Sequence, residues 1–290
     1  MKRQIILLPI ALFLFLGTAG QLFAQKKHEF SISAGGGLSN LNYTKIAGNQ
    51  EFGFSGSFSL GYHFFFTQEF GIGTGAEVAL YNTKFTMNNY NVNSIATDKD
   101  GDSFEFCSTI SGYSEKESII FLKIPLMLQI QSGGSQQFYM AAGGKVGFPF
   151  NGKYNSTISS LYNSGFYEYE NSLYDSQEFL GFGKFTNKQY KGDLTFKTTF
   201  FVSVEAGLKS QVGDNTFLYF GAYLDYGLND FIDTPTESYP FAEYNADNNP
   251  PFKVNSVLTS HYSQDSDTSP QLFTDKVKPM AVGLKLRLAF

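Results

Sequence analysis

Strict alternation of apolar and small polar residues is the feature that most constrains the fold of this chain. Between Glu51 and Phe66, Phe, Leu and Tyr take almost every second position, and Gly, Ser and His take most of the positions between them. Successive side chains of an extended strand point to opposite faces, so the pattern predicts a strand with one apolar and one polar face. The same pattern predicts further strands at Phe30–Leu38, Phe70–Leu80, Ile120–Ile130, Phe138–Phe150, Leu194–Leu208, Leu218–Leu228 and Met280–Phe290.

The connections between these eight predicted strands alternate between short and long. Short turns at one end and long polar loops at the other, on an even number of strands, are typical of barrels in the bacterial outer membrane. The sequence therefore predicts an all-β fold, an eight-stranded antiparallel up-and-down transmembrane β-barrel with long extracellular loops. A water-soluble eight-stranded barrel remains the alternative, because alternation does not tell which face points inward. The long loops are expected at Ser39–Glu51, Asn82–Ser118, Asn151–Asp193 and Asn229–Asp275.

Charged residues are confined to one face of the predicted strands. The apolar faces carry no Asp, Glu, Lys or Arg. A charge that faces the middle of a bilayer costs about 2–4 kcal/mol, so this vacancy predicts that hydrocarbon chains contact the apolar faces. The opposite faces then point into a polar interior, where we expect a charge network with a structural or a gating role. Its members are Glu77, Lys123, Lys145, Asp225, Glu205, Lys285 and Arg287.

Part of this network is expected at one depth of the barrel. If Gln131 pairs with Gln137 across the turn, Lys123 falls directly opposite Lys145. Like charges in opposite positions repel unless carboxylates lie between them. We expect Glu77 and Asp225 to supply these carboxylates. A second set, His63 with Glu205, Lys285 and Arg287, is expected nearer the periplasmic end.

The N-terminus has the pattern of an export signal. Lys2 and Arg3 precede the apolar run Ile5–Leu16, and small residues follow near Ala24. We expect residues 1–24 to be a signal peptide and residues 25–290 to form the barrel domain, with a retained anchor as the alternative. The net charge of −5 and the lack of a basic block argue against nucleic acid as a partner. Cys107 is the one cysteine, so an internal disulfide is excluded.

Several segments resemble a known family. Phe121–Leu128 (FLKIPLML) and Phe138–Gly144 (FYMAAGG) are similar to consecutive strands of the PorT-family outer-membrane β-barrel proteins of Bacteroidota-type bacteria, and Tyr226–Asp230 (YGLND) is similar to a strand end of that family. The closing segment Gly283–Phe290 resembles the strand that the outer-membrane insertion machinery reads, with Phe290 as the terminal aromatic signal. The resemblance implies a barrel in the outer membrane of a Gram-negative bacterium. One relative is linked to protein secretion.

Three other features bear on metal binding, catalysis and ligand binding. Asp98–Asp102 (DKDGD) starts like a calcium loop, but Ser103 and Thr109 stand where such a loop needs Gly and Glu, which favours a solvated acidic turn. No His lies beside a Ser or carboxylate at the expected outer rim, so we expect no catalytic site, no metal and no cofactor. The third long loop is rich in aromatics, which suit either packing over the barrel mouth or binding of a glycan or protein.

The expected function is a non-catalytic outer-membrane barrel that serves as an envelope anchor or has a loop-mediated binding or assembly role, including a secretion-associated one. A small gated pore and a lipid-modifying outer-membrane enzyme are the alternatives. The expected partners are outer-membrane lipid and lipopolysaccharide, the barrel insertion machinery, and an extracellular or periplasmic protein or glycan. We expect the protein to be a monomer.

Overall fold

The computed structural model describes residues 27–134, 136–232, 239–262 and 271–290. The predicted signal peptide, residues 1–24, lies outside the described residues. Within the described ranges the chain is almost entirely strands, with two single-turn 3₁₀ helices, η2 (Glu168–Glu170) and η3 (Glu178–Leu180). No helix in these ranges is long and apolar enough to cross a membrane.

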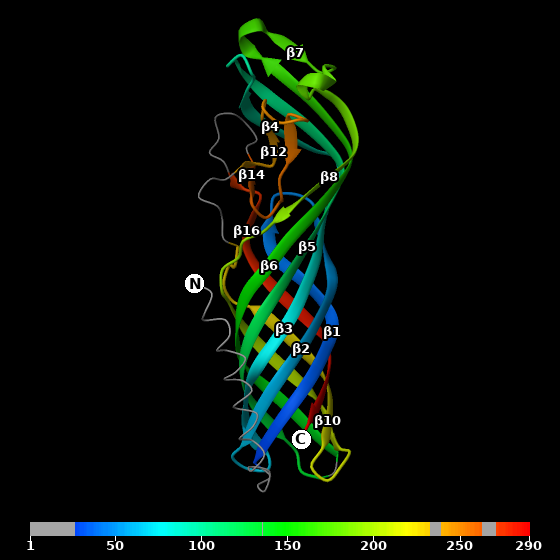
Figure 1. The fold of residues 1–290 in the computed structure, drawn as a ribbon, viewed down its shortest axis with the longest axis vertical. Helices are drawn as coiled ribbons and strands as arrows, with labels where there is room; N and C mark the ends of the chain where they lie inside the picture. The colour runs from blue at the N-terminus through cyan, green and yellow to red at the C-terminus, as the bar shows by residue number, and fades with distance from the viewer. Residues whose placement is uncertain (1–26, 135, 233–238, 263–270) are drawn as a thin grey trace, which may run out of the picture.

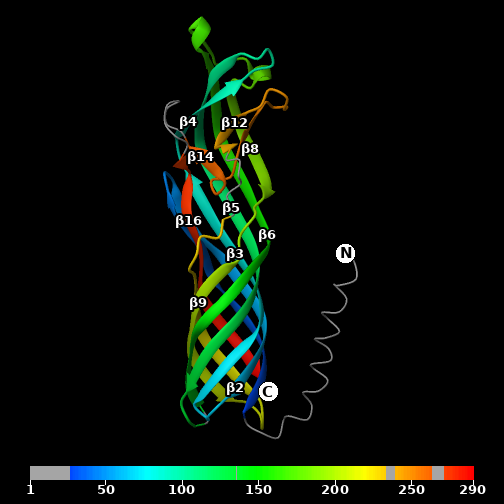
Figure 2. The same ribbon diagram turned by 90° about the vertical axis from the view of Figure 1, so that its left-hand side faces the viewer.

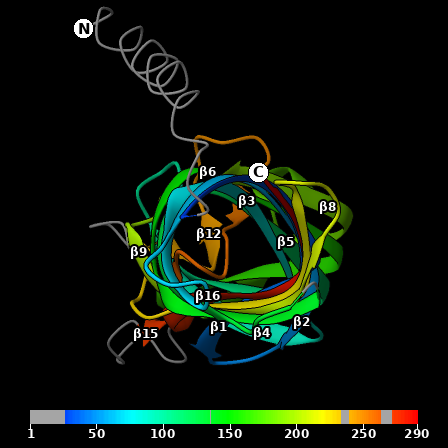
Figure 3. The same ribbon diagram turned by 90° about the horizontal axis from the view of Figure 1, so that it is seen from below.

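Eight strands of the described chain close into one antiparallel barrel (Figures 1 and 3). Each strand pairs with the next in the series, β5 pairs with β6, and the last strand pairs with the first. This ring confirms the predicted eight-stranded up-and-down barrel. The C-terminus lies at the end of the barrel that carries the short turns (Figure 1). The wall strands are β1 (His28–Lys45), β2 (Asn49–Phe65), β3 (Phe70–Met87), β5 (Ser103–Gln131), β6 (Gln136–Tyr167), β9 (Thr199–Gln211), β10 (Phe217–Gly227) and β16 (Thr274–Ala289).

The lower half of the barrel is apolar outside and charged inside. Leu126 on β5 is 61% exposed, whereas Lys123 on the same strand is 0% exposed. Phe58 and Phe220, on strands elsewhere in the ring, are more than half exposed. A water-soluble barrel would bury its apolar side chains, because their exposure to water is unfavourable. The continuous apolar outer band is therefore the surface that contacts lipid, and the soluble alternative is wrong.

The strands extend far above this band, and the predicted loop boundaries were wrong there. Strands β5 and β6 contain 29 and 32 residues and pair from Gln131 and Tyr139 up to Glu105 and Phe166. Figure 2 shows them rising well above the rest of the barrel. Most of the predicted second and third loops is thus sheet. The added strands are β4 (Tyr90–Thr97), β7 (Ser172–Tyr174) and β8 (Gly183–Asp193).

Two further boundaries differ from the prediction. The first predicted loop shrinks to the bend between β1 and β2, residues 46–48, because both strands continue above the membrane. In contrast, β9 begins at Thr199, so residues 194–198 are not part of it. Leu194 is buried, and Phe196 forms an isolated bridge to Ile232. The apolar alternation of residues 194–198 thus reflects packing above the barrel wall.

The fourth loop folds into the extracellular mouth of the barrel. Phe241 and Phe273 are fully buried, and their ring centroids lie 4.9 Å apart. Phe273 also contacts Phe85 of the wall strand β3 and Tyr90 of β4. Figure 3 shows β12 within the outline of the ring. The mouth is thereby filled with aromatic side chains. The short strands of this loop are β11 (Tyr239–Pro240), β12 (Ala242–Tyr244), β13 (Phe252–Val254), β14 (Ser260–Tyr262) and β15 (Gln271–Leu272).

Candidate functional site

Four of the predicted network residues meet in the middle of the lumen. We call Glu77, Lys123, Lys145 and Asp225 the central cluster. The Nζ atom of Lys123 lies 2.8 Å from a carboxylate oxygen of Asp225 and 3.5 Å from one of Glu77. The Nζ atom of Lys145 lies 3.1 Å from Glu77 and 3.0 Å from Asp225. Both carboxylates therefore lie between the two ammonium groups, and all four side chains are buried.

The register that led to this expectation was wrong. Gln131 pairs with Tyr139 rather than Gln137, because the turn between β5 and β6 is longer than assumed. Lys123 consequently lies opposite Gly147, and Lys145 lies opposite Pro125. This offset separates the two lysines along the strands. Small or apolar neighbours leave space for the carboxylates from β3 and β10.

Two side chains outside the predicted set, Ser203 and Tyr81, complete the central cluster. Ser203 donates a hydrogen bond of 2.6 Å to Asp225, and Tyr81 donates one of 3.3 Å to the same carboxylate. Lys123 donates to the Tyr81 hydroxyl and lies over the Tyr81 ring, 4.3 Å from its centroid. Tyr81 lies on the same inward face of β3 as Glu77 and Ala79, so its inward position follows from the alternation. The hydrogen bond from Tyr81 to Asp225 was not predictable, because Asp225 lies on β10 across the lumen.

The remaining predicted network residues, Glu205, Lys285 and Arg287, form a second group nearer the periplasmic end, which we call the periplasmic group. Lys285 lies 3.1 Å from Glu205, which also accepts a hydrogen bond of 2.7 Å from Tyr139. Arg287 contacts the His63 ring nitrogen at 2.8 Å, and its second terminal nitrogen lies 4.0 Å from Glu205. That nitrogen also donates to Gln129 at 2.9 Å. The group therefore joins β2, β5, β9 and β16 across the lumen.

A further ion pair lies in the same half of the lumen and was not predicted as part of the site. The Nζ atom of Lys209 lies 2.5 Å from Glu29, which also accepts a hydrogen bond from Tyr219 at 2.5 Å. Both charges face inward in the sequence pattern, so the signal was present. In this half of the lumen each buried carboxylate has a cationic partner. Such an arrangement fills and fixes an interior, because removal of one partner would leave a buried, unpaired charge.

Above the lipid-facing band, the lumen holds two buried acidic side chains that form no ion pair with a described Lys, Arg or His side chain. Glu115 receives a hydrogen bond of 2.7 Å from Ser256 of the fourth loop and contacts the Tyr113 hydroxyl. Burial raises the pKa of Glu115 to about 7, although these hydrogen bonds favour its ionised form. Burial and the neighbouring charge of Glu115 raise the pKa of Glu117 well above its ordinary value. Neither carboxylate oxygen of Glu117 has a hydrogen-bond partner among the described residues.

The aromatic side chains of the predicted third loop lie in two different environments at the upper end of the barrel. Tyr167 and Phe182 are buried, and both contact Phe104. In contrast, Tyr169 is 65% exposed and Phe179 is 82% exposed. Packing thus accounts for the first pair, whereas the rings of the second pair are exposed at the end of the molecule.

The acidic turn predicted at Asp98–Asp102 is held by its own hydrogen bonds. The Asp98 carboxylate accepts hydrogen bonds from the backbone of Asp100 and Asp102 at 3.0 and 2.9 Å. Tyr167 and Tyr169 donate to the carboxylates of Asp98 and Asp102, respectively. Nowhere in the described chain do three or more His, Cys, Asp or Glu side chains gather as metal ligands would. The carboxylates of the turn thus dock it on the end of β6 and on η2.

The chain matches a known family of barrel domains. Residues 23–233 match the family described as "Outer membrane protein beta-barrel domain". The chain belongs to this family. It is therefore an outer-membrane β-barrel of a Gram-negative bacterium. Among curated proteins, no match was found.

The comparison with solved structures found two bacterial proteins at low sequence identity and low TM-score. Neisserial surface protein A (NspA) is 10% identical, with 90% of this chain and 97% of that chain covered and a TM-score of 0.30. The attachment invasion locus protein Ail of Yersinia pestis is 11% identical, with coverage of 90% and 99% and a TM-score of 0.28. The family assignment of this barrel rests on the matched domain.

Proposed function

We propose that this outer-membrane barrel is a monomeric, non-catalytic anchor that holds an extracellular binding surface away from the membrane. The observation that carries the proposal is a group of exposed apolar side chains on η2, β7 and η3. We call Tyr169, Leu173, Phe179 and Leu180 the tip patch. They are between 38% and 82% exposed and belong to one short segment at the far end of the barrel (Figure 1). Exposed apolar groups of this kind favour contact with another molecule.

Continuous sheet supports the display of this surface. The ladder between β5 and β6 joins the membrane-spanning wall to the tip. Near the tip, Tyr162 donates a hydrogen bond of 2.9 Å to Asp175, and Tyr167 donates one of 3.0 Å to Asp98. A surface that is ordered before binding loses less conformational entropy when a partner binds. The partner we propose is a protein or glycan that presents an apolar or aromatic face.

The filled lumen favours the role of an anchor over that of a pore. An eight-stranded barrel has an interior just wide enough to be filled by side chains. Here the central cluster, the periplasmic group and the aromatic mouth occupy successive levels of that interior. We propose that the charge network is structural rather than gating. Ring closure also leaves the wall without a free edge in the membrane, which suits a monomer.

A PorT-type relationship would make a secretion-associated assembly one form of the binding role. Phe290 exchanges two backbone hydrogen bonds of 2.9 Å with Phe30 and is 40% exposed. This position keeps its ring accessible at the periplasmic end, as we propose for a residue read by the insertion machinery.

Photocrosslinking in intact cells tests the binding role. A photoreactive residue at Phe179 should capture a partner, and the same residue at Val212, exposed in a short turn at the opposite end, should not capture it. Added wild-type barrel should compete for the captured partner, whereas the Leu173→Ser/Phe179→Ser variant should not. Equal competition by the two proteins, or absence of capture from Phe179, would contradict the proposal.

A further inference from the structure

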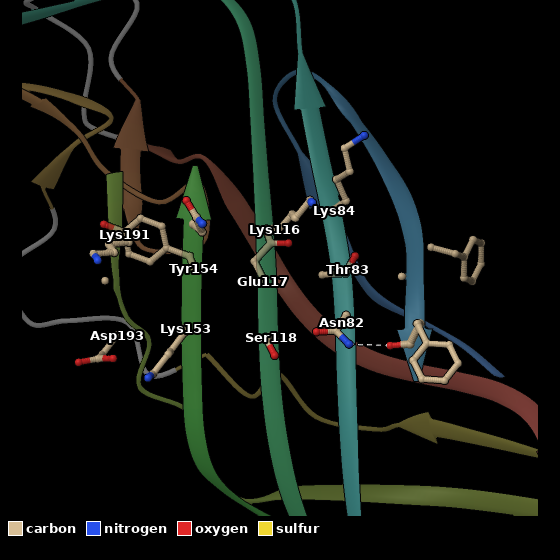
Figure 4. A pocket seen from close by; sticks show the side chains of 15 residues that line it. Asn82, Thr83, Lys84, Lys116, Glu117, Ser118, Lys153, Tyr154, Lys191 and Asp193 are labelled. Carbon is tan, nitrogen blue, oxygen red and sulfur yellow. Dashed lines mark hydrogen bonds between the residues drawn. The ribbon is translucent and has the colours of Figure 1, made fainter. Parts of the chain in front are cut away.

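A shallow, open groove of about 850 Å³ lies on the outer face of the barrel, just above the lipid-facing band (Figure 4). It crosses β2, β3, β5, β6 and β8. Lys116 and Ser118 line the groove. They lie on the same outward face of β5 as the exposed Leu122 and Ile124. Asn82 of the groove donates a hydrogen bond of 2.8 Å to the Phe54 carbonyl, which joins its two right-hand strands.

Lysines dominate the charge of this groove. Strand pairing places Lys84 directly opposite Lys116, and Asn155 lies between Lys116 and Lys191 in the same row. Lys153 lies one step below, between Ser118 and Asp193. These four lysines come from four neighbouring strands. We call Lys84, Lys116, Lys153 and Lys191 the lysine row.

Most of the lysine row lacks a neutralising partner in the protein. Lys84 forms an ion pair of 3.0 Å with Glu51. The other three lysines are exposed and make no ion pair with a described carboxylate. Like charges in directly opposite positions destabilise a sheet, so an anion between Lys84 and Lys116 would relieve a repulsion that the fold itself creates.

The depth of the row indicates which anion reaches it. Lys116 lies four residues above Ile120 on β5. At about 3.3 Å per residue and a strand tilt of about 40°, Lys116 is therefore roughly 10 Å farther from the membrane centre than Ile120. That height corresponds to lipid headgroups, and a lysine stem can lower its ammonium group toward them. Phe52 and Phe54, which are 53% and 63% exposed, form the apolar end of the groove. The groove thus combines a row of lysine side chains with exposed apolar rings.

We propose that the groove binds a phosphorylated glycolipid of the outer leaflet, the lipid A part of lipopolysaccharide. Its phosphates would lie against the lysine row, and its acyl chains would run down the outer face beside Phe54. Asn155 and Ser118, between the lysines, offer hydrogen bonds to sugar hydroxyls. The inference rests on the placement in the outer membrane and not on the tip patch.

Native mass spectrometry of the detergent-solubilised full-length protein tests the proposal. The probes are diphosphoryl lipid A, the same lipid after removal of its phosphates, and inorganic phosphate. The test variant is Lys116→Gln/Lys191→Gln, and the matched control is Lys99→Gln/Lys184→Gln, which removes two exposed lysines outside the groove. Heat-modifiable migration on gels checks that each variant is folded. If the double variant does not fold, the single variant Lys191→Gln replaces it.

The wild-type protein should bind diphosphoryl lipid A and lose most of that binding when the lipid phosphates are removed. The double variant should bind it about 30-fold more weakly and Lys191→Gln about fivefold, since each lysine near an anionic surface contributes a comparable step. The control should match the wild type. Equal binding of both lipids, equal losses in test and control variants, or displacement of the lipid by inorganic phosphate at similar concentration would overturn the proposal.

Discussion

The Nζ atom of Lys123 lies 2.8 Å from the Oδ2 atom of Asp225, on strands that are not neighbours in the barrel. Strands β6 and β9 separate β5 from β10 in the ring, so this ion pair crosses the lumen. The side chain of Lys145 reaches the same carboxylate from β6. One aspartate therefore links three parts of the wall and occupies the space through which ions would have to pass.

We predict that Lys123→Met destabilises the barrel by about 3–5 kcal/mol, because it leaves Asp225 buried with one cation fewer. The double variant Lys123→Met/Asp225→Asn should recover most of this loss. Urea unfolding in detergent, followed by circular dichroism, measures both effects. Lys84→Met, which breaks a half-exposed ion pair with Glu51, is the control and should change little. A single variant as stable as the control would show that the cluster is not a structural element.

Glu115 and Glu117 predict a pH dependence above the membrane. Their pKa values are raised, that of Glu115 to about 7, so the folded state binds more protons than the unfolded state. The contribution of Glu115 to stability is therefore greatest below about pH 4.5 and decreases by roughly 3 kcal/mol as the pH rises to about 7. The contribution of Glu117 decreases with rising pH in the same direction.

The melting temperature in detergent should accordingly be lower at pH 8 than at pH 5.5. Glu117→Gln removes one of the two acidic groups and should reduce this difference, while Glu168→Gln, an exposed residue, should leave it unchanged. A wild-type melting temperature that is higher at pH 8 than at pH 5.5 would contradict the raised pKa values of Glu115 and Glu117.

The seam between β1 and β16 depends on two facing glycines. Gly37 pairs with Gly283, and a Cβ atom on Gly283 would lie 2.9 Å from the Gly37 Cα and closer still to the Gly36 carbonyl oxygen. Gly283→Ala should therefore destabilise ring closure by about 1–3 kcal/mol. The fraction of heat-modifiable protein after refolding measures this loss. Gly133→Ala, in an open turn, should refold like the wild type.

The fourth loop should open when its aromatic contacts are removed. Phe273 is fully buried against Phe85, Tyr90 and Phe241, so Phe273→Ala should cost about 3–5 kcal/mol of local packing. Limited proteolysis on intact cells should then cleave the fourth loop faster than in the wild type. Leu272→Ala, at a partly exposed neighbour, is the matched control. Equal cleavage of the two variants would show that Phe273 does not hold the loop.

The membrane-spanning part of the fold was predictable, because each lipid-facing position must be uncharged and each strand alternates. That rule placed Lys123 and Asp225 inside and Leu126 outside. Above the membrane the rule reverses, since water now contacts the outer face and apolar rings such as Phe104 and Phe106 point inward. The alternation also changes phase near Gly112, which has a left-handed backbone conformation. Polar outer faces and this break made β4, β7, β8 and the upper parts of β5 and β6 look like loops.

The candidate site was predictable in its members but not in all of its contacts. Inward charges follow from alternation, whereas the pairing of Lys145 with Pro125 depends on a turn whose length was misjudged. Glu115 and Glu117 lay in a segment interpreted as a loop, so their burial could not be foreseen. Lys116 and Lys191 were missed for the same reason. Only the cross-strand register shows that they share one row.

Conductance in planar bilayers tests most directly whether the lumen is closed by its own side chains. The wild-type protein should produce no channel openings. Lys123→Ala/Lys145→Ala should also stay silent, because the periplasmic group and the aromatic mouth still fill the lumen at other levels. Steady openings of the wild type, or openings that appear when these two lysines are removed, would contradict a closed lumen and favour a gated pore.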